Sequence, residues 1–258
     1  MAPPFLAYYG VATNNVSILQ AAVEQCRLYR QILLANTTSG QFTPPVSHPE
    51  VAAGLWKHIT GPVNDDAGLW STGNAWAAAG MARVLATVLK APPSLFFNNL
   101  PAHTSNLSVT WKNQAIHDLT TFICEILDAA ILMPTDGGLL HNYLDDTTWF
   151  GEISGSALLA SVAYRLSVLA PSLGLADGKV QYYVEWAEEI RFIFGQGHMI
   201  SNESYGTATP AVNPLGWGDR KPHTTGSPEG QNFVVMMYAA WRDCVYAGVD
   251  GCHGGAEW

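Results

Sequence analysis

Two stretches of the chain carry the same order of chemically active side chains. Each begins with Gly-Leu, continues to a histidine, a pair of aspartates and a tryptophan, and ends in small residues that can start a helix. The first is GLWKHITGPVNDDAGLWSTGNAW, residues 54–76, and the second is GGLLHNYLDDTTWFGEISGSA, residues 137–157. Polar groups beside flat aromatic faces suit the binding of a sugar, whose ring has both hydroxyl groups and apolar faces. The repeat therefore predicts two equivalent loops at one binding site.

The candidate binding residues stand in these stretches. His58 and His141 follow the two Gly-Leu pairs, where each can contact a sugar or serve a structural role. Trp70 and Trp76 flank the first helix start, and each is a candidate for stacking on a sugar ring or for the core. Asn74 lies between them and can bind a hydroxyl group, although its position favours capping the helix. We expect these five residues at the substrate-binding rim.

Charged residues complete the candidate site. Asp145 and Asp146 are the candidate catalytic carboxyl groups, although paired acids in a loop more often face water or bind backbone N–H groups. Glu152 and Glu229 directly precede helix starts, where the helix dipole explains both. Arg220 in the last loop is the candidate for binding a carboxylate, with a solvated turn as the alternative. The His and Asp spacing matches no metal motif, so no metal is expected.

Apolar residues recur at the helical period in six segments, and no strand pattern stands out, so the prediction is an all-α fold. The predicted helices span about residues 14–34, 73–89, 113–133, 154–169, 180–194 and 228–245. The first, third and fifth carry charge, whereas the second, fourth and sixth are apolar nearly all round, which indicates alternating outer and inner helices. We expect a single domain over residues 1–258, a toroid of about three (α/α) hairpins whose loops meet at the inner-helix N-termini.

Composition narrows the range of partners. The net charge of −9 argues against nucleic acid and against an anionic membrane surface, because both attract basic proteins. Arginine or proline interrupts the longest apolar runs well before the roughly 20 residues that a membrane span needs, so no such span is expected. Inner-helix N-termini nevertheless favour anions, so an acidic ligand can bind at that end of the fold.

Cysteines and glycosylation sequons favour a secreted protein. Cys244 and Cys252 lie close enough in sequence to close a local disulfide loop, whereas Cys26 and Cys124 fall on apolar helix faces as core thiols. N-glycosylation sequons occur at Asn15, Asn36, Asn106 and Asn202. The N-terminal residues MAPPFLAYYG do not have the pattern of a signal peptide.

Several ordered motifs together resemble glycoside hydrolase family 105, and the likeness is closest to its fungal members. The matching segments are FLAYYG, GLWKH, WSTGNAW, LLHNYLDD, EISGSA and SPEGQNF, which span nearly the whole chain. The resemblance implies a six-hairpin (α/α)6 barrel and hydrolysis of terminal unsaturated uronic acids in pectin-type oligosaccharides. In that reaction an Asp protonates the alkene carbon and water adds to its neighbour, which is general acid/base chemistry. It also implies that His58 lies in the active site and that no cofactor takes part.

The chain departs from the family pattern in two respects. The family run Trp-x-Arg-Gly-Asn-Gly-Trp is matched at Trp70, Gly73, Asn74 and Trp76, but Thr72 replaces the arginine. The proton-donating Asp of the family precedes the segment at which this chain begins, and about three hairpins are expected where the family has six. The last helix would then leave an apolar face bare, so we expect a homodimer or a missing N-terminal half to cover it.

These departures leave two functions open. The first is an unsaturated glucuronyl or rhamnogalacturonyl hydrolase, with the acid supplied from outside this chain or by one of its own carboxyl groups. The alternative is a non-catalytic relative that keeps a carbohydrate-binding cleft or serves in assembly. A terpene-cyclase-like toroid is disfavoured, because the sequence lacks the acidic metal-binding motifs of that fold.

Overall fold

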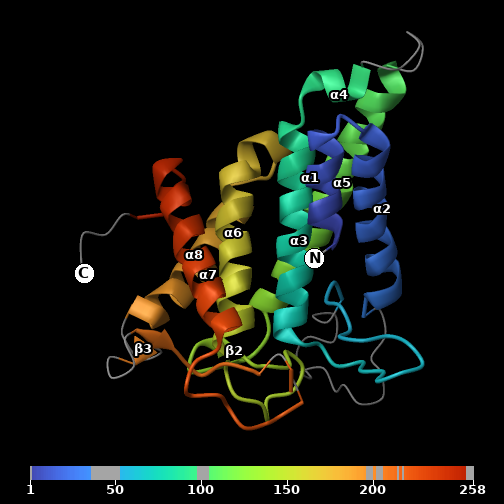
Figure 1. Ribbon diagram of the computed structural model, residues 1–258. Helices are drawn as coiled ribbons and strands as arrows, with labels where there is room; N and C mark the ends of the chain where they lie inside the picture. The colour runs from blue at the N-terminus through green and yellow to red at the C-terminus, as the bar shows by residue number, and fades with distance from the viewer. Residues whose placement is uncertain are drawn as a thin grey trace.

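A computed structural model describes residues 2–35, 53–97, 105–195, 200–201, 206–213, 215–216 and 218–253, without the side chains of 97, 105–109 and 200–201 (Figure 1). The described chain is helical, as predicted. Its helices are α1 (Ala2–Ala12), α2 (Val16–Leu33), α3 (Ser71–Lys90), α4 (Pro93–Phe97), α5 (Ser105–Ile131), α6 (Ile153–Leu173), α7 (Asp177–Gly195) and α8 (Pro228–Tyr246). Two antiparallel pairs of two-residue strands lie in the loops: β1 (Thr135–Asp136) with β2 (Leu139–Leu140), and β3 (Ile200–Ser201) with β4 (Thr207–Ala208).

The helices form an inner and an outer row. Helices α1, α3, α6 and α8 pack side by side in that order, and α2, α5 and α7 pack behind them against α1, α3 and α6 (Figure 1). The inner helices all begin at the same end, the lower one in Figure 1, where the long loops gather. This is the predicted arc of (α/α) hairpins, with α1 as one further inner helix.

The burial of the inner row follows from its composition. Along α6, which carries Arg165 as its only charged side chain, the first twelve residues are all buried. This helix also has the length and apolar composition of a membrane span, but 83% of that stretch is buried inside the described protein, as in a core helix. The outer helices instead exchange partly exposed ion pairs, including Arg30 with Glu125 at 2.7 Å and Lys179 with Asp128 at 2.8 Å. Such pairs contribute about 1 kcal/mol or less each.

The periodicity of apolar residues did not predict two of the helices. Helix α1 has the sequence APPFLAYYGVA, in which apolar residues occupy every side and two prolines stand in the first turn. Proline is tolerated there because the first N–H groups of a helix lack partners within it. Helix α5 begins at Ser105, eight residues before the predicted start, and the short α4 precedes it in a connection predicted as loop.

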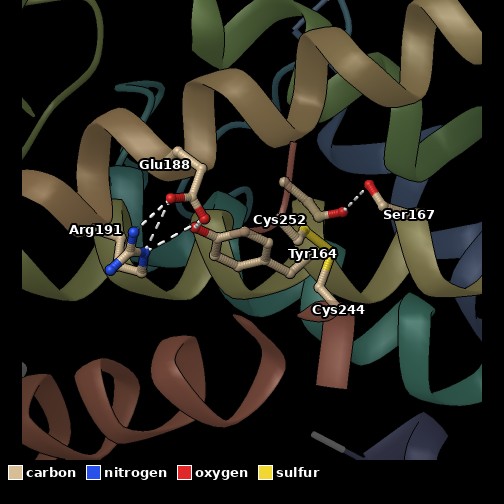
Figure 2. Close-up of a disulfide and its surroundings, with 7 residues drawn as sticks. Tyr164, Ser167, Glu188, Arg191, Cys244 and Cys252 are labelled. Carbon is tan, nitrogen blue, oxygen red and sulfur yellow. Dashed lines mark hydrogen bonds and ion pairs between the residues drawn. A yellow bond between two sulfur atoms is a disulfide. The ribbon is translucent and has the colours of Figure 1, made fainter. Parts of the chain in front are cut away.

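A disulfide fastens the end of α8. Cys244 and Cys252 are bonded, with Cα atoms 5.9 Å apart, whereas Cys26 and Cys124 are buried free thiols, as predicted (Figure 2). Figure 2 also shows the polar contact between α6 and α7, in which the Tyr164 hydroxyl donates to Glu188 at 2.8 Å and Arg191 pairs with the same carboxylate. The disulfide closes a short loop after α8, the last inner helix, and ties this loop to the helix.

The disulfide predicts a measurable share of stability. Replacing both Cys244 and Cys252 by serine should lower the free energy of unfolding by about 2.5 kcal/mol, because the closed loop restricts the unfolded chain. Urea unfolding followed by circular dichroism measures the change. Reductant should destabilise the natural chain and leave the double variant unchanged; equal sensitivity of both proteins to reductant would contradict the prediction.

Candidate functional site

Three loops meet at the N-terminal ends of α3, α6 and α8. Trp70 of the first loop forms a backbone bridge with Tyr143 of the second, and Ile153 N–H donates to the Pro210 carbonyl of the third at 3.0 Å. Trp70, Tyr143, Trp149 and Val212, from all three loops, form one buried apolar cluster. The two repeated stretches therefore pair directly with each other.

His58 lies in a polar cluster beside these aromatics. Its Nδ1 is 2.9 Å from Oδ2 of Asp66, and the Tyr143 hydroxyl donates to the same oxygen. Burial by itself would raise the pKa of Asp66, but hydrogen bonds from His58, Tyr143 and the Gly68 N–H hold it below its ordinary value. Because an ionised Asp66 can only accept, Nδ1 of His58 carries the proton between them. Asp66 thus fixes the orientation of the imidazole ring.

Burial of Tyr143, followed by the neighbouring charge of Asp66, raises the pKa of its phenol, so the hydroxyl keeps its proton as a donor. The sequence analysis identified His58 as a candidate binding residue but did not identify Asp66 or Tyr143. Asp66 belongs to the first aspartate pair, and the recurrence of such a pair in both loops was the signal for it.

The tryptophans connect this cluster to the inner helices. The Trp70 ring centroid is 4.5 Å from that of His58 and 5.4 Å from that of Trp76. Trp70 is only 2% exposed and donates from Nε1 to Asn142 at 2.9 Å, so a sugar has no open ring face there. Trp76 is partly exposed and lines a cavity of about 360 Å³. Of the two candidate stacking residues, Trp76 is the accessible one.

Asn74 and His141 are structural in this fold. Asn74 is 1% exposed, and its amide group bonds both the N–H and the carbonyl of Trp56, at 2.8 and 3.0 Å. In this structure the side chain is fully used in holding the first loop, so it has no group left for a sugar hydroxyl. His141 is 4% exposed, and its Nδ1 contacts the Trp149 carbonyl. Neither presents a side chain to a ligand.

The acidic pair of the second loop divides into two different environments. Asp146 forms an ion pair with Arg220 at 3.1 Å and accepts from the Thr148 hydroxyl at 2.6 Å. Burial acts against it, but these bonds hold the pKa of Asp146 below its ordinary value, so it is a poor proton donor. Burial raises the pKa of Asp145, whose Oδ1 accepts from the Leu69 N–H at 3.2 Å. Arg220 also lies over the Trp149 ring at 4.8 Å, so its charge is already paired.

Glu152 joins the starts of two inner helices. It is the N-cap of α6, accepting from the Ser154 N–H at 2.6 Å and from the Gly155 N–H, and it also accepts from the Ser71 hydroxyl of α3 at 2.8 Å. Burial raises its pKa against these hydrogen bonds. Thr72, in the place of the family arginine, is fully buried and donates to Glu152 at 3.3 Å. The first turn of α3 therefore offers no cation to a ligand.

Among the residues that the structure describes, no group of three or more His, Cys, Asp and Glu side chains could hold a metal ion. The polar groups of the rim bind one another and the backbone instead.

Solved structures that share this fold include glycoside hydrolases and a polysaccharide lyase. A possible family 105 member from Salmonella enterica aligns over 92% of this chain and 53% of its own, at 19% identity and a TM-score of 0.62. A family 105 enzyme from Clostridium acetobutylicum aligns over 93% and 62%, at 12% identity and a TM-score of 0.61. The unsaturated glucuronyl hydrolase of Bacillus sp. GL1 aligns over 99% and 59%, at 16% identity and a TM-score of 0.59.

These likenesses establish that the described chain shares the all-α fold of these solved structures. The chain spans about half the length of the solved structures that it matches first. No family model matches the sequence, and no curated protein matches it.

The hydrogen bonds that Asp66 accepts from His58 and Tyr143 predict a pH-dependent contribution to stability. Asp66→Asn should lower the free energy of unfolding near pH 7 by about 1 kcal/mol, since charge-assisted hydrogen bonds are lost. Because the folded-state pKa of Asp66 is depressed, its contribution is present above the unfolded pKa of about 3.9 and is lost as the pH falls through the lower folded value.

Denaturant titrations of both proteins between neutral and acidic pH measure this difference. Asp65→Asn is the matched control, because the neighbouring Asp65 is exposed and bonds only the Gly61 N–H, at 3.3 Å, among the contacts described. A gap between the natural chain and Asp66→Asn that widens toward acid would contradict the assignment.

Proposed function

We propose that this chain forms part of an unsaturated-uronyl hydrolase site, acting on terminal unsaturated uronic acids of acidic oligosaccharides. The observation that carries the proposal is the meeting of the three loops at the inner-helix N-termini, with His58 oriented by Asp66 and Trp76 lining an open cavity beside them. The fold shared with unsaturated glucuronyl hydrolases and family 105 members supports it. The Bacillus neighbour is named as responsible for degrading glycosaminoglycan, a uronate-containing polymer.

The proposed reaction is hydration of the C4–C5 double bond. A carboxylic acid gives its proton to C4, positive charge develops at C5, and a water molecule adds there after losing a proton to the resulting carboxylate. The hemiketal that forms opens to a ketone and releases the second sugar as an alcohol. The partial positive charge at the inner-helix N-termini favours the uronate carboxylate at this end of the fold.

The alternative is a carbohydrate-binding or assembly relative without turnover. Its support is chemical: Thr72 stands where the family has arginine, and the predicted contacts from Trp70, Asn74 and His141 are used inside the protein. Binding of a uronate without its consumption would establish this second function.

The proposed function predicts consumption of an unsaturated pectin disaccharide, seen as loss of the ultraviolet absorbance of its conjugated double bond. Trp76→Ala should weaken apparent substrate affinity about tenfold, because the accessible ring face is removed. Replacing the buried Trp186 of the outer helix α7 by phenylalanine serves as an aromatic control and should leave the kinetics unchanged. Failure of the natural chain to consume any unsaturated uronide would overturn the hydrolase proposal.

We further propose that a second copy of the chain covers the open ends of the helical arc. The end helices expose apolar side chains: Phe5 is 66% and Tyr8 51% exposed on α1, and Val235 is 60% and Tyr246 80% exposed on α8. Since the chain covers 53% of the length of a possible family 105 neighbour, two copies supply about the same amount of chain.

Light scattering should accordingly give about twice the monomer mass of 27.8 kDa. Phe5→Lys combined with Val235→Lys should shift the protein toward monomer, because both charges would be buried in the interface. Matched substitutions at Thr13 and Asp250, which are also exposed, should leave the mass unchanged. A natural chain that stays at 27.8 kDa at high concentration would overturn the dimer.

Secretion of the protein is also proposed, on the support of the disulfide and the sequons. Asn15 is exposed at the start of α2, while Asn36 and Asn202 and the side chain of Asn106 lie outside the described residues. Isolation of the chain from its source with Cys244 and Cys252 reduced would contradict secretion. The likeness to fungal members stays a prediction.

A further inference from the structure

The cavity beside Trp76 combines four kinds of side chain that can bind an acidic sugar. It lies between α3 and α8 and measures about 360 Å³, with Leu158 of α6 among its lining residues. Trp76 and Arg83, seven residues apart, lie on one face of α3, and Glu229 and Asn232 lie on the facing side of α8. The lining thus contains an aromatic ring, a cation, a carboxyl group and an amide.

Arg83 is a cation without a carboxylate partner among the described residues. It is exposed, and its Nη2 lies 3.8 Å from the sulfur of Met236 on α8. The other arginines in the inner row differ, because Arg165 pairs with Asp243 and Arg242 with the same carboxylate. A guanidinium group turned toward a cavity and left without an anion is suited to bind a carboxylate ligand in a bidentate manner.

Glu229 is a carboxyl group whose surroundings disfavour its ionised form. Its Oε2 is fully covered and has no hydrogen-bond partner in the described structure. An ionised oxygen in that position would lose its hydration without compensation. Burial and then the neighbouring charge of Glu152 raise the pKa of Glu229, against a stabilising hydrogen bond with the side chain of Trp76. A raised pKa favours the protonated form, which is the form in which a carboxyl group acts as a general acid.

Arg83 and Glu229 line the cavity at different levels along the helix axes. Met236, which Arg83 contacts, lies seven residues after Glu229, about 10 Å along the axis of α8. The carboxylate of an unsaturated uronate is attached to C5, next to C4, so the Arg83 and Glu229 side chains have to converge on neighbouring atoms of the ligand. A ring held in this position has a face against Trp76.

We propose that this cavity is the subsite for the terminal uronic acid, in which Arg83 binds the carboxylate, Trp76 packs on the ring and Glu229 is the proton donor. The inference rests on the proposed function for its substrate. Glu229 transfers its proton to C4 as the C4–C5 π electrons form the new C–H bond. Water then bonds to C5, and its released proton returns to the Glu229 carboxylate. In this arrangement Arg83 provides the cation that Thr72 does not, from a position eleven residues further along α3.

Two measurements on the full chain test the proposal, and the first is turnover of unsaturated digalacturonate. Glu229→Gln should lower kcat by about a hundredfold or more, because the amide keeps the shape of the side chain but has no acidic proton. Affinity for galacturonate, measured by calorimetry, should stay within about threefold. Glu189→Gln, the same change at an exposed position on α7, is the matched control and should leave both unchanged.

The second measurement is binding alone. Arg83→Gln should weaken galacturonate binding at least about tenfold while leaving neutral galactose unaffected, because only the uronate offers a carboxylate to the guanidinium. Circular dichroism confirms that each variant is folded.

The outcomes separate the inference from the proposed function. Turnover that survives Glu229→Gln, or that is abolished by Asp145→Asn instead, overturns the donor assignment while the hydrolase proposal stands. If the natural chain is inactive, the hydrolase proposal and the donor role fail together, and binding alone decides the subsite. Equal galacturonate affinity in the natural chain and Arg83→Gln overturns the subsite.

Discussion

The buried carboxyl group of Glu152 is the constraint on which the rest of the site depends. It caps α6 through the N–H groups of Ser154 and Gly155 and accepts from the Ser71 hydroxyl at the start of α3. A helix start leaves N–H groups unpaired, and a buried carboxylate without donors is costly, so each satisfies the other. Two inner helices must therefore begin at the same level and at a fixed separation. The loops that precede them are brought into backbone pairing as a consequence.

That arrangement determines which side chains remain for a ligand. Trp70, Asn74 and His141 are used in fastening the paired loops, so the polar rim is largely self-satisfied. Groups deeper in the arc are not: Arg83 has no carboxylate partner in the described chain, and Glu229 has a covered oxygen without a donor. The packing faces of the inner row are apolar and contain few polar groups, so Arg83 has no carboxylate and the Oε2 atom of Glu229 has no donor among the described residues. Unsatisfied groups of opposite character on either side of one cavity are what a bound acidic sugar would satisfy.

Much of the fold could be predicted because its signals are local. The Ser227-Pro228 start of α8 lies as expected, and the buried α6 and the charged outer helices follow from their patterns of apolar residues. Helix α1 was not predicted, because it has apolar residues on every side and therefore no polar face that would reveal a helical period. Within the site, His58 was recognisable from its repeated context, whereas its partner Asp66 was not. The pairing of Asp66 with His58 and Tyr143 depends on how two loops distant in sequence meet.

By itself, the sequence determined that charged outer helices alternate with apolar inner helices. It also determined the local disulfide and the three loops that meet at one end. Each of these features depends on the spacing of residues along the chain. Only the tertiary structure decided which of the candidate side chains remain accessible. Trp70 and Trp76 stand six residues apart with the same chemistry, yet one is covered by neighbours from another loop and the other lines a cavity. Accessibility and pKa depend on what packs around a group, and for these residues the neighbours come from segments far away in the sequence.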